Sequence, residues 1–194
     1  MMESVQQTTS REFAFVAGLN RLADDRGAMA KLRRSIRAAN PMADPNAASV
    51  LGPLLYGVHE LDEPRFYLVA GLFALTQSGA ARRRAVVPEK PWEGESLGQS
   101  FHRLRTSSAG ESLDKRFVAL LNSDPEDLPV RLRQAVRLLN SADVQIDWVR
   151  LLWDLKHFGD DDRKVQENWA RDYWKAGGDQ SAEEQSENSQ LNNT

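Results

Sequence analysis

The chain contains no cysteine among its 194 residues, which excludes a disulfide-bonded scaffold, a thiolate metal site and a cysteine nucleophile. Long apolar runs are absent as well, because the longest, Phe66 to Leu75, is about half of what a bilayer span requires. Residues 1–10 contain neither the basic nor the apolar region of a secretion signal. We therefore expect a soluble protein of a reducing compartment, located in the cytoplasm and without membrane contact.

Motifs that would build an active site around a metal or a nucleotide are also missing. The three histidines, His59, His102 and His157, are too far apart in the sequence for the usual zinc and iron patterns. Asp160 to Asp162 form an acidic run, but no glycine and glutamate follow at EF-hand spacing, so the start of a helix is the favoured interpretation. No glycine-rich phosphate loop is present. We expect neither a metal nor a cofactor.

One segment, Gly94 to Gly98, matches the G-x-S-x-G nucleophile elbow of serine hydrolases, with Ser96 at its centre. That motif needs a buried strand before it, and the preceding residues 88–93 contain two prolines that a central strand does not tolerate. The start of a helix explains the glycine and the serine equally well. We therefore predict that the protein is not an enzyme and that Ser96 lies near a helix cap.

Apolar residues recur at the three- and four-residue spacing of amphipathic helices over most of residues 10–175, with no strand alternation and no internal repeat. The stretch after Pro64 is apolar almost all round, which is typical of a helix at the centre of a bundle. The fold class we predict is all-α, a helical bundle in two lobes joined by a long loop. Helix starts are predicted at Thr9 (a capping box with Glu12), after Gly27, and at Asp44, Asp62, Asp127, Asp147 and Asp162.

Composition divides the chain into four parts. We expect an N-terminal helical lobe at 10–79, a loop or linker at 80–95, a C-terminal helical lobe at 96–176 and a disordered acidic tail at 177–194. Glycine, proline and three consecutive arginines mark the loop. The tail contains four acids, no base and one large apolar residue, so it cannot bury enough surface to offset the entropy of ordering. Without the tail the formal charge changes from −3 to +1.

Basic residues are segregated from acidic ones along the chain. Three stretches, 28–42, 64–88 and 128–142, contain arginine or lysine and no acid, whereas an ordinary solvated helix face mixes both signs. Arginine, which outnumbers lysine here, binds phosphate through two parallel hydrogen bonds and stacks on bases. The pattern indicates a surface for a phosphate backbone. The candidate nucleic-acid-binding residues are Lys31, Arg33, Arg34, Arg37, Arg82, Arg83, Arg84, Arg103, Arg131, Arg133 and Arg137.

Other interpretations of these residues remain open. A basic helix face also fits a helical adaptor that binds only acidic protein surfaces, and most charged helix faces are simply solvated. The tryptophans fit either base-stacking platforms or the hydrophobic core. Trp148 and Trp169 lie on apolar stripes, which favours the core, whereas the positions of Trp92 and Trp174 do not decide between the two.

Four short motifs, in their order and spacing over residues 10–174, resemble a known family. They are Met29-Ala-Lys-Leu-Arg-Arg34, Gly94-Glu-Ser-Leu-Gly98, Leu132-Arg133 followed by Leu138-Leu139, and Asp147-Trp148. Each motif is weak alone, and the ordered set is fairly specific. The chain resembles the small subunit of the type I-E CRISPR surveillance complex, Cascade (the CasB family).

This resemblance implies a non-catalytic, all-helical protein of two lobes. Copies of the family's subunit line the inner face of Cascade beside the guide RNA, and a separate protein cuts the DNA. The implied partners are the guide (CRISPR) RNA, target DNA including the displaced single strand, the large and backbone subunits, and a second copy of this chain. The implied role is to stabilise the R-loop that forms when guide RNA opens target DNA. Lys31, Arg33, Arg34 and Arg133 match the family's motifs, and the other candidates come from the charge pattern alone.

Overall fold

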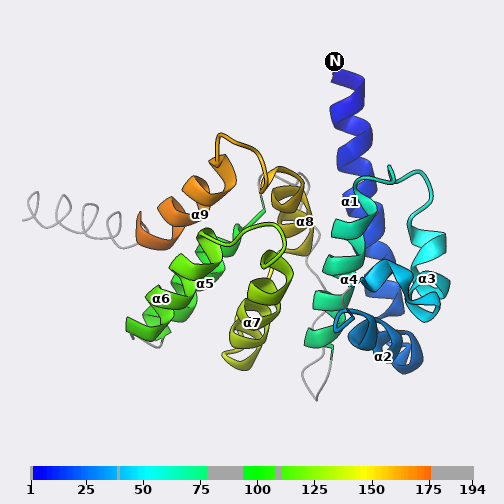
Figure 1. Cartoon of the computed structure of the whole chain (residues 1–194), viewed down its shortest axis with the longest axis horizontal. Coiled ribbons are helices and arrows are strands. Elements are labelled where there is room, and N and C mark those ends of the chain that lie inside the picture. The colour runs from blue at the N-terminus through cyan, green and yellow to red at the C-terminus, as the bar shows by residue number, and fades with distance from the viewer. Residues whose placement is uncertain (1, 39, 78–93, 108–110, 176–194) are drawn as a thin grey trace, which may run out of the picture.

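The computed structural model describes residues 2–38, 40–77, 94–107 and 111–175, with side chains described between Arg11 and Trp174 (Figure 1). Within these ranges every regular element is a helix, which confirms the all-α prediction. Among these residues no helix combines the length and the apolarity needed to cross a membrane. The elements are α1 (Met2–Leu22), α2 (Arg26–Ser35), η1 (Pro41–Ala43), α3 (Pro45–Leu51), η2 (Gly52–Leu54), α4 (Glu63–Thr76), α5 (Leu97–Ser107), α6 (Glu111–Leu121), α7 (Leu128–Ser141), α8 (Trp148–His157) and α9 (Lys164–Lys175).

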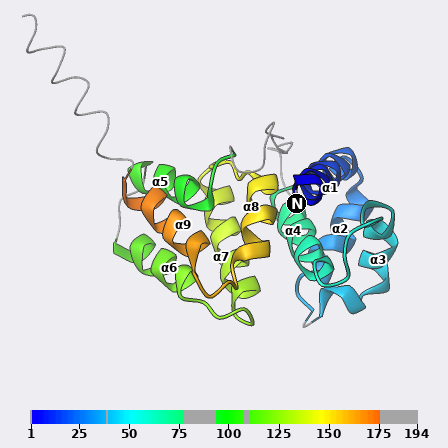
Figure 2. The same ribbon diagram turned by 90° about the horizontal axis from the view of Figure 1, so that it is seen from above.

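Helices α1 to α4 gather at one end of the molecule and α5 to α9 at the other, and α4 meets α7 and α8 between them (Figure 2). The buried apolar side chains of both groups nevertheless belong to one continuous core. The domain limits expected at 10–79, 80–95 and 96–176 therefore stay a prediction. Most of the expected linker and the expected tail at 177–194 lie outside the described residues.

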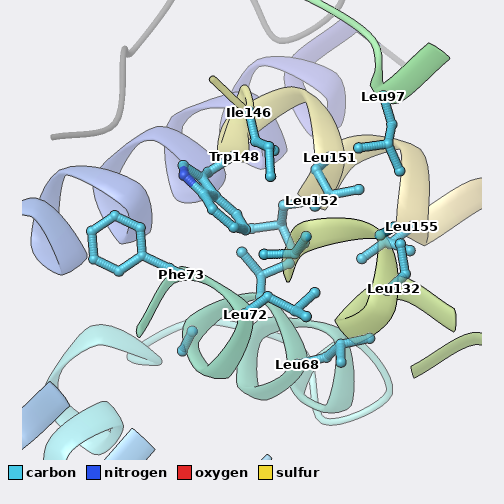
Figure 3. Close-up of a cluster of buried hydrophobic side chains, with 14 of the residues drawn as sticks. Leu68, Leu72, Phe73, Leu97, Leu132, Ile146, Trp148, Leu151, Leu152 and Leu155 are labelled. Atoms are coloured by element: carbon cyan, nitrogen blue, oxygen red, sulfur yellow. The ribbon is translucent and has the colours of Figure 1, made fainter. Parts of the chain in front are cut away.

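Helix α4 occupies the centre of the molecule, as its nearly uniform apolar sequence predicts. All residues from Phe66 to Ala74 are buried, so α4 packs against α2 on one side and against α7 and α8 on the other. Figure 3 shows Leu68, Leu72 and Phe73 of α4 facing side chains of α7 and α8. The ring of Phe73 meets Trp148 of α8 edge to face, with centroids 5.7 Å apart. Burying this helix on both sides joins the two groups of helices into one core.

Helix starts follow the sequence at some positions and not at others. Asp44 and Asp147 are N-caps as predicted, since their carboxylates accept hydrogen bonds from Asn46 N and Arg150 N. The helix start predicted at Thr9 is wrong, because α1 already begins at Met2. The helix predicted after Gly27 begins at Arg26, one residue before that glycine, with Asp25 as its cap. Asp62 and Asp127 stand at the predicted starts of α4 and α7 but form no side-chain cap, and α9 begins at Lys164, two residues after Asp162.

Two polar contacts join the helix groups beside the apolar core. Glu12 of α1 is fully buried and accepts a hydrogen bond from Lys156 Nζ of α8 at 3.1 Å. The same ammonium group lies 3.4 Å from the carboxylate of Asp62, at the start of α4. Arg133 of α7 donates a hydrogen bond to the carbonyl oxygen of Ile36, just after α2, at 2.7 Å. These contacts fix how α1 and α2 lie against α8 and α7.

Candidate nucleic-acid interface

Four of the predicted cations lie on α2 and in the turn that follows it, where Arg37 is two residues past the end of the helix. The buried residues of α2 include Met29 and Leu32, and the helix packs against α4 and α3, which leaves the remaining face partly or fully exposed. Within the described part of the chain none of these four side chains forms an ion pair. The cations are the partly buried Lys31 and Arg33 and the exposed Arg34 and Arg37.

Helix α7 contributes two further predicted cations, Arg131 and Arg137, which are both exposed. They line a groove between α6 and α7 together with Lys115 and Arg116 of α6. Arg116, Arg131 and Arg137 have no ion-pair partner among the residues described, whereas Lys115 lies 2.8 Å from Glu111 one turn earlier. The groove is therefore predominantly cationic.

Sequence reasoning missed Lys115 and Arg116. Helix α6 also contains Glu111 and Asp114, so it did not stand out as an acid-free stretch. The spacing of charges along the helix could have identified Arg116. Glu111 and Lys115 form an i,i+4 pair, which leaves Arg116 without a carboxylate of its own.

Two predicted residues are held by contacts inside the protein. Arg103 of α5 forms an ion pair with Glu95, just before the same helix. Arg133 is partly buried and donates to Ile36 O, so that its guanidinium group serves the packing of α7 against α2. Arg82, Arg83 and Arg84 lie outside the described residues.

The Arg133 contact also brings the two sets of cations toward one another. Arg37 directly follows Ile36, so it lies beside the segment of α7 that holds Arg133. Arg137 lies one turn further along α7, toward the groove that α6 and α7 share. Figure 1 shows α2, α7 and α6 along the lower side of the molecule. We call this set the basic surface; its residues are Lys31, Arg33, Arg34, Arg37, Lys115, Arg116, Arg131 and Arg137.

Ser96, the centre of the hydrolase-like motif, forms a helix cap. Its hydroxyl accepts a hydrogen bond from Gln99 N, and the Gln99 side chain accepts one from Ser96 N, which is the reciprocal pattern of a capping box. The same hydroxyl donates to the carboxylate of Asp172 on α9. His102 is six residues further along α5, and its ring contacts the carbonyl oxygen of Tyr173. These contacts agree with the predicted cap.

The glycines of this motif allow close contacts between backbones and side chains. A Cβ atom on Gly98 would come within 3.0 Å of the backbone of Trp169 in α9, and one on Gly94 would meet the carboxylate of Asp147. The motif Gly94 to Gly98 thus docks the start of α5 onto α8 and α9.

The side chains of the acidic run, Asp160 to Asp162, form contacts within the protein. Asp162 accepts a hydrogen bond from Lys164 N, and His157 lies 3.1 Å from Asp160. No cluster of three metal-binding side chains occurs in the described ranges.

Burial raises the pKa of Asp154, which accepts hydrogen bonds from Arg150 and from the indole nitrogen of Trp169. Trp169 and Trp148 are core residues, as their apolar stripes predicted.

Comparison with known proteins gives the family. The sequence model described as CRISPR-associated protein Cse2 matches residues 28–174. A CRISPR-associated protein Cse2 from Thermus thermophilus is 37% identical over 152 residues, which cover 77% of this chain and 80% of that protein. The structure of M. ruber CasB gives a TM-score of 0.67 at 31% identity, covering 91% of this chain and 97% of that one. A chain from a CRISPR RNA-guided surveillance complex gives a TM-score of 0.66 at 26% identity, covering 85% and 92%. The resemblance expected from the sequence motifs is confirmed, and the chain belongs to the CRISPR-associated Cse2 (CasB) family.

Proposed function

We propose that this protein is a non-catalytic small subunit of a type I-E Cascade complex and that it binds nucleic acid without sequence preference. The basic surface on α2, α6 and α7 contacts the phosphate backbone. Bound in this way, the subunit stabilises the R-loop between guide RNA and target DNA and holds the displaced non-target strand. Its partners are the guide RNA, the target DNA, the large and backbone subunits, and a second copy of itself.

The observation that carries this proposal is the set of cations on α2, α6 and α7 that lack carboxylate partners in the described part of the chain. Arg34, Arg37, Arg131 and Arg137 are exposed and form no ion pair there. A guanidinium group that is not neutralised within the protein is available to a phosphate, and neutralising phosphates releases condensed counterions. The formal charge of −3 for the whole chain does not oppose this, because the field near a surface depends on the local charges.

Modest contacts of this kind are sufficient for the proposed role. In RNA-guided systems of the Cas9 type, the RNA–DNA duplex formed is about as stable as the DNA duplex that it replaces. Protein contacts to the backbone therefore decide whether the opened loop persists. A subunit that holds strands through their phosphates needs a basic track and no reader of base identity. Rigid helix faces with regularly spaced cations meet that requirement.

A charge-matched pair of variants tests the proposal. The triple variant Arg37→Ala, Arg131→Ala, Arg137→Ala removes three cations of the basic surface. The control Arg11→Ala, Arg21→Ala, Lys164→Ala removes three exposed cations elsewhere and lowers the net charge equally. The affinity of each variant for a single strand of nucleic acid is measured as a function of salt concentration, and the wild-type protein is the reference. We expect the slope of log affinity against log salt to fall by about 2 units in the first variant, since each single-strand phosphate contact contributes about 0.7.

The control variant separates a local surface from a general charge effect. We expect it to keep most of the wild-type slope. Equal losses in both variants would mean that overall charge alone governs binding, and an unchanged slope in both would rule out the basic surface as the phosphate contact. Co-purification of the wild-type chain with guide RNA and large protein partners tests its place in the complex.

A second candidate function is a helical adaptor that makes no direct contact with nucleic acid. It is favoured by the loop between η2 and α4, where Tyr56 is 95% exposed and Leu61 is 77% exposed. Two large apolar side chains exposed in one short loop can contribute to a protein contact site. An adaptor's complex would be unaffected by added single-stranded polynucleotide beyond a plain ionic-strength effect, whereas a strand-binding subunit would respond to it.

A further inference from the structure

Trp174, near the end of α9, is an exposed aromatic side chain held by other aromatic rings. It is 46% exposed, whereas Trp148 and Trp169 are buried in the core. Its indole contacts the rings of Tyr173 and Phe117 at centroid distances of 4.9 and 5.8 Å. Both contacts are edge to face, with interplanar angles of 76° and 71°, and no ring in the described part of the chain stacks parallel to it. A planar group from outside can therefore lie against the exposed part of the indole.

The rings behind Trp174 are themselves fixed in place. Tyr173 and Phe117 are fully buried, and the Tyr173 hydroxyl donates a hydrogen bond to Asp114 of α6. Arg105 of α5 lies over the Tyr173 ring, 5.4 Å from its centroid. A rigid support lowers the entropy lost when a ligand stacks on the exposed ring.

This aromatic site lies next to the basic surface, because both use helix α6. Asp114 and Val118 lie one turn apart on the side of α6 that faces α9, and Val118 is 40% exposed. Lys115, which lines the groove between α6 and α7, is three residues before Val118 and so neighbours it on the helix. Trp174 contacts Phe117, the residue before Val118, so a strand that leaves the groove over Lys115 would approach the exposed indole.

Arg171, a cation near the ring that forms no ion pair among the described residues, favours an anionic ligand over a neutral one. Arg171 precedes Trp174 by one turn of α9 and is exposed, and Arg105 is partly exposed beside Tyr173. Among the acids, Asp114 accepts the Tyr173 hydroxyl and lies 3.5 Å from Arg105, and Asp172 accepts the hydroxyl of Ser96. An exposed aromatic ring near a cation is a combination that proteins use to hold single-stranded nucleic acid.

We propose that Trp174 is a stacking site for one unpaired nucleobase of the strand whose phosphates lie on the basic surface. Every base presents a flat π face, so the site adds affinity without sequence preference. It distinguishes an unpaired strand from a duplex, whose bases are stacked on one another. The inference rests on the proposed function and adds to it the chemical form of the ligand, a single strand with accessible bases.

The test compares intact and abasic strands bound to the full-length protein at low salt, where phosphate contacts are strongest. A strand of roughly 20 nucleotides matches the length of an R-loop. The variants are Trp174→Ala, Trp174→Phe and, as matched control, Tyr56→Ala, which removes an exposed aromatic ring at the other end of the molecule. We expect Trp174→Ala to bind the intact strand about tenfold more weakly than wild type, since one stacked base contributes on the order of that factor. We expect Trp174→Phe to keep most of the affinity and Tyr56→Ala to keep all of it.

Two further measurements separate stacking from phosphate contact. Wild type and Trp174→Ala should bind the abasic strand equally, and they should share the same salt slope on the intact strand. The decrease in tryptophan fluorescence on binding should be smaller in Trp174→Phe than in wild type.

Each contrary result has a distinct meaning. If Trp174→Ala binds intact and abasic strands like wild type, the stacking site is wrong while the proposed function stands. If the variant binds strands normally but loses self-association in sedimentation, the ring is a protein contact and the inference is again overturned. If the wild-type protein binds no strand at low salt, both the inference and the phosphate-binding function fail.

Discussion

Glu12 of α1 is an ionisable residue inside the protein core. It is fully buried, only one of its carboxylate oxygens has a hydrogen-bond partner in the described structure, and that partner is Lys156. Burial raises the pKa of Glu12 above its usual 4.5, because the loss of hydration outweighs the attraction of Lys156. The folded protein therefore holds a proton on Glu12 at pH values where the unfolded chain has released it.

This shift predicts the pH dependence of stability. The folded state binds more protons than the unfolded state between pH 4.5 and the raised pKa, so the contribution of Glu12 to the free energy of unfolding falls as the pH rises through that window. The variant Glu12→Gln cannot ionise and loses this fall. Urea denaturation at about pH 5 and about pH 7.5 should show that the variant gains stability at the higher pH, relative to the lower, compared with wild type.

The matched control is Glu60→Gln, which changes an exposed carboxylate. It should reproduce the wild-type difference between the two pH values. If Glu12→Gln instead lost stability on going to the higher pH relative to wild type, the ion pair with Lys156 would outweigh burial, and the pKa of Glu12 would be lowered rather than raised.

At the scale of single helices, the apolar spacing predicted most of the fold. The stripe of Leu113, Phe117 and Leu120 is buried in α6, and the apolar run after Pro64 is the central helix α4. Such stripes are local, so the sequence alone reveals them. The start of α1 was not predictable in this way, because Thr9 and Glu12 have capping-box spacing while the true partner of Glu12 is 144 residues away.

Two of the three arginines of α7, Arg133 and Arg137, have different surroundings in the structure. Arg133 donates to Ile36 O and fastens α7 to α2, whereas Arg137, one turn later, is exposed and without an ion pair in the described residues. Replacing Arg133 with methionine keeps the aliphatic stem and removes the donor. We expect Arg133→Met to lower the free energy of unfolding by about 1.5–3 kcal/mol, the range for a hydrogen bond that involves a charged group.

Arg137→Met serves as the control on the same helix. It should leave the free energy of unfolding nearly unchanged and reduce the salt slope of single-strand binding by about 0.7 units. Urea denaturation and salt-dependent binding assays of both variants check the assignment. A loss of stability in Arg137→Met together with none in Arg133→Met would reverse the two roles.

For the molecule as a whole, the charge pattern identified part of the candidate site. Acid-free stretches located the cations of α2 and α7, because the absence of acids can be read directly from the sequence. They did not show that Arg103 pairs with Glu95, or that Arg133 contacts Ile36 across 97 positions, since those contacts depend on how the helices pack. The groove with Lys115 was likewise visible only once α6 and α7 lay side by side.

The arrangement of the basic surface predicts how binding depends on strand length. Its cations lie in two sets, one on α2 and one on α6 and α7, joined where Arg133 meets Ile36. A strand of roughly 20 nucleotides can contact both sets, whereas one of about 4 nucleotides occupies a single set. The variant Arg34→Ala, Arg37→Ala removes two cations of the α2 set alone. We expect it to weaken binding of the long strand and to lower its salt slope by about 1.4 units.

The short strand is the internal control for this prediction. A short strand occupies one set at a time, so the double variant leaves its binding in the groove between α6 and α7 intact, and its affinity should change less than that of the long strand. The variant Arg131→Ala, Arg137→Ala should weaken both strands, because it alters the groove itself. If the α2 variant lost the same fraction of affinity for both lengths, the two sets would not act along one strand, and α2 would have to bind a separate partner.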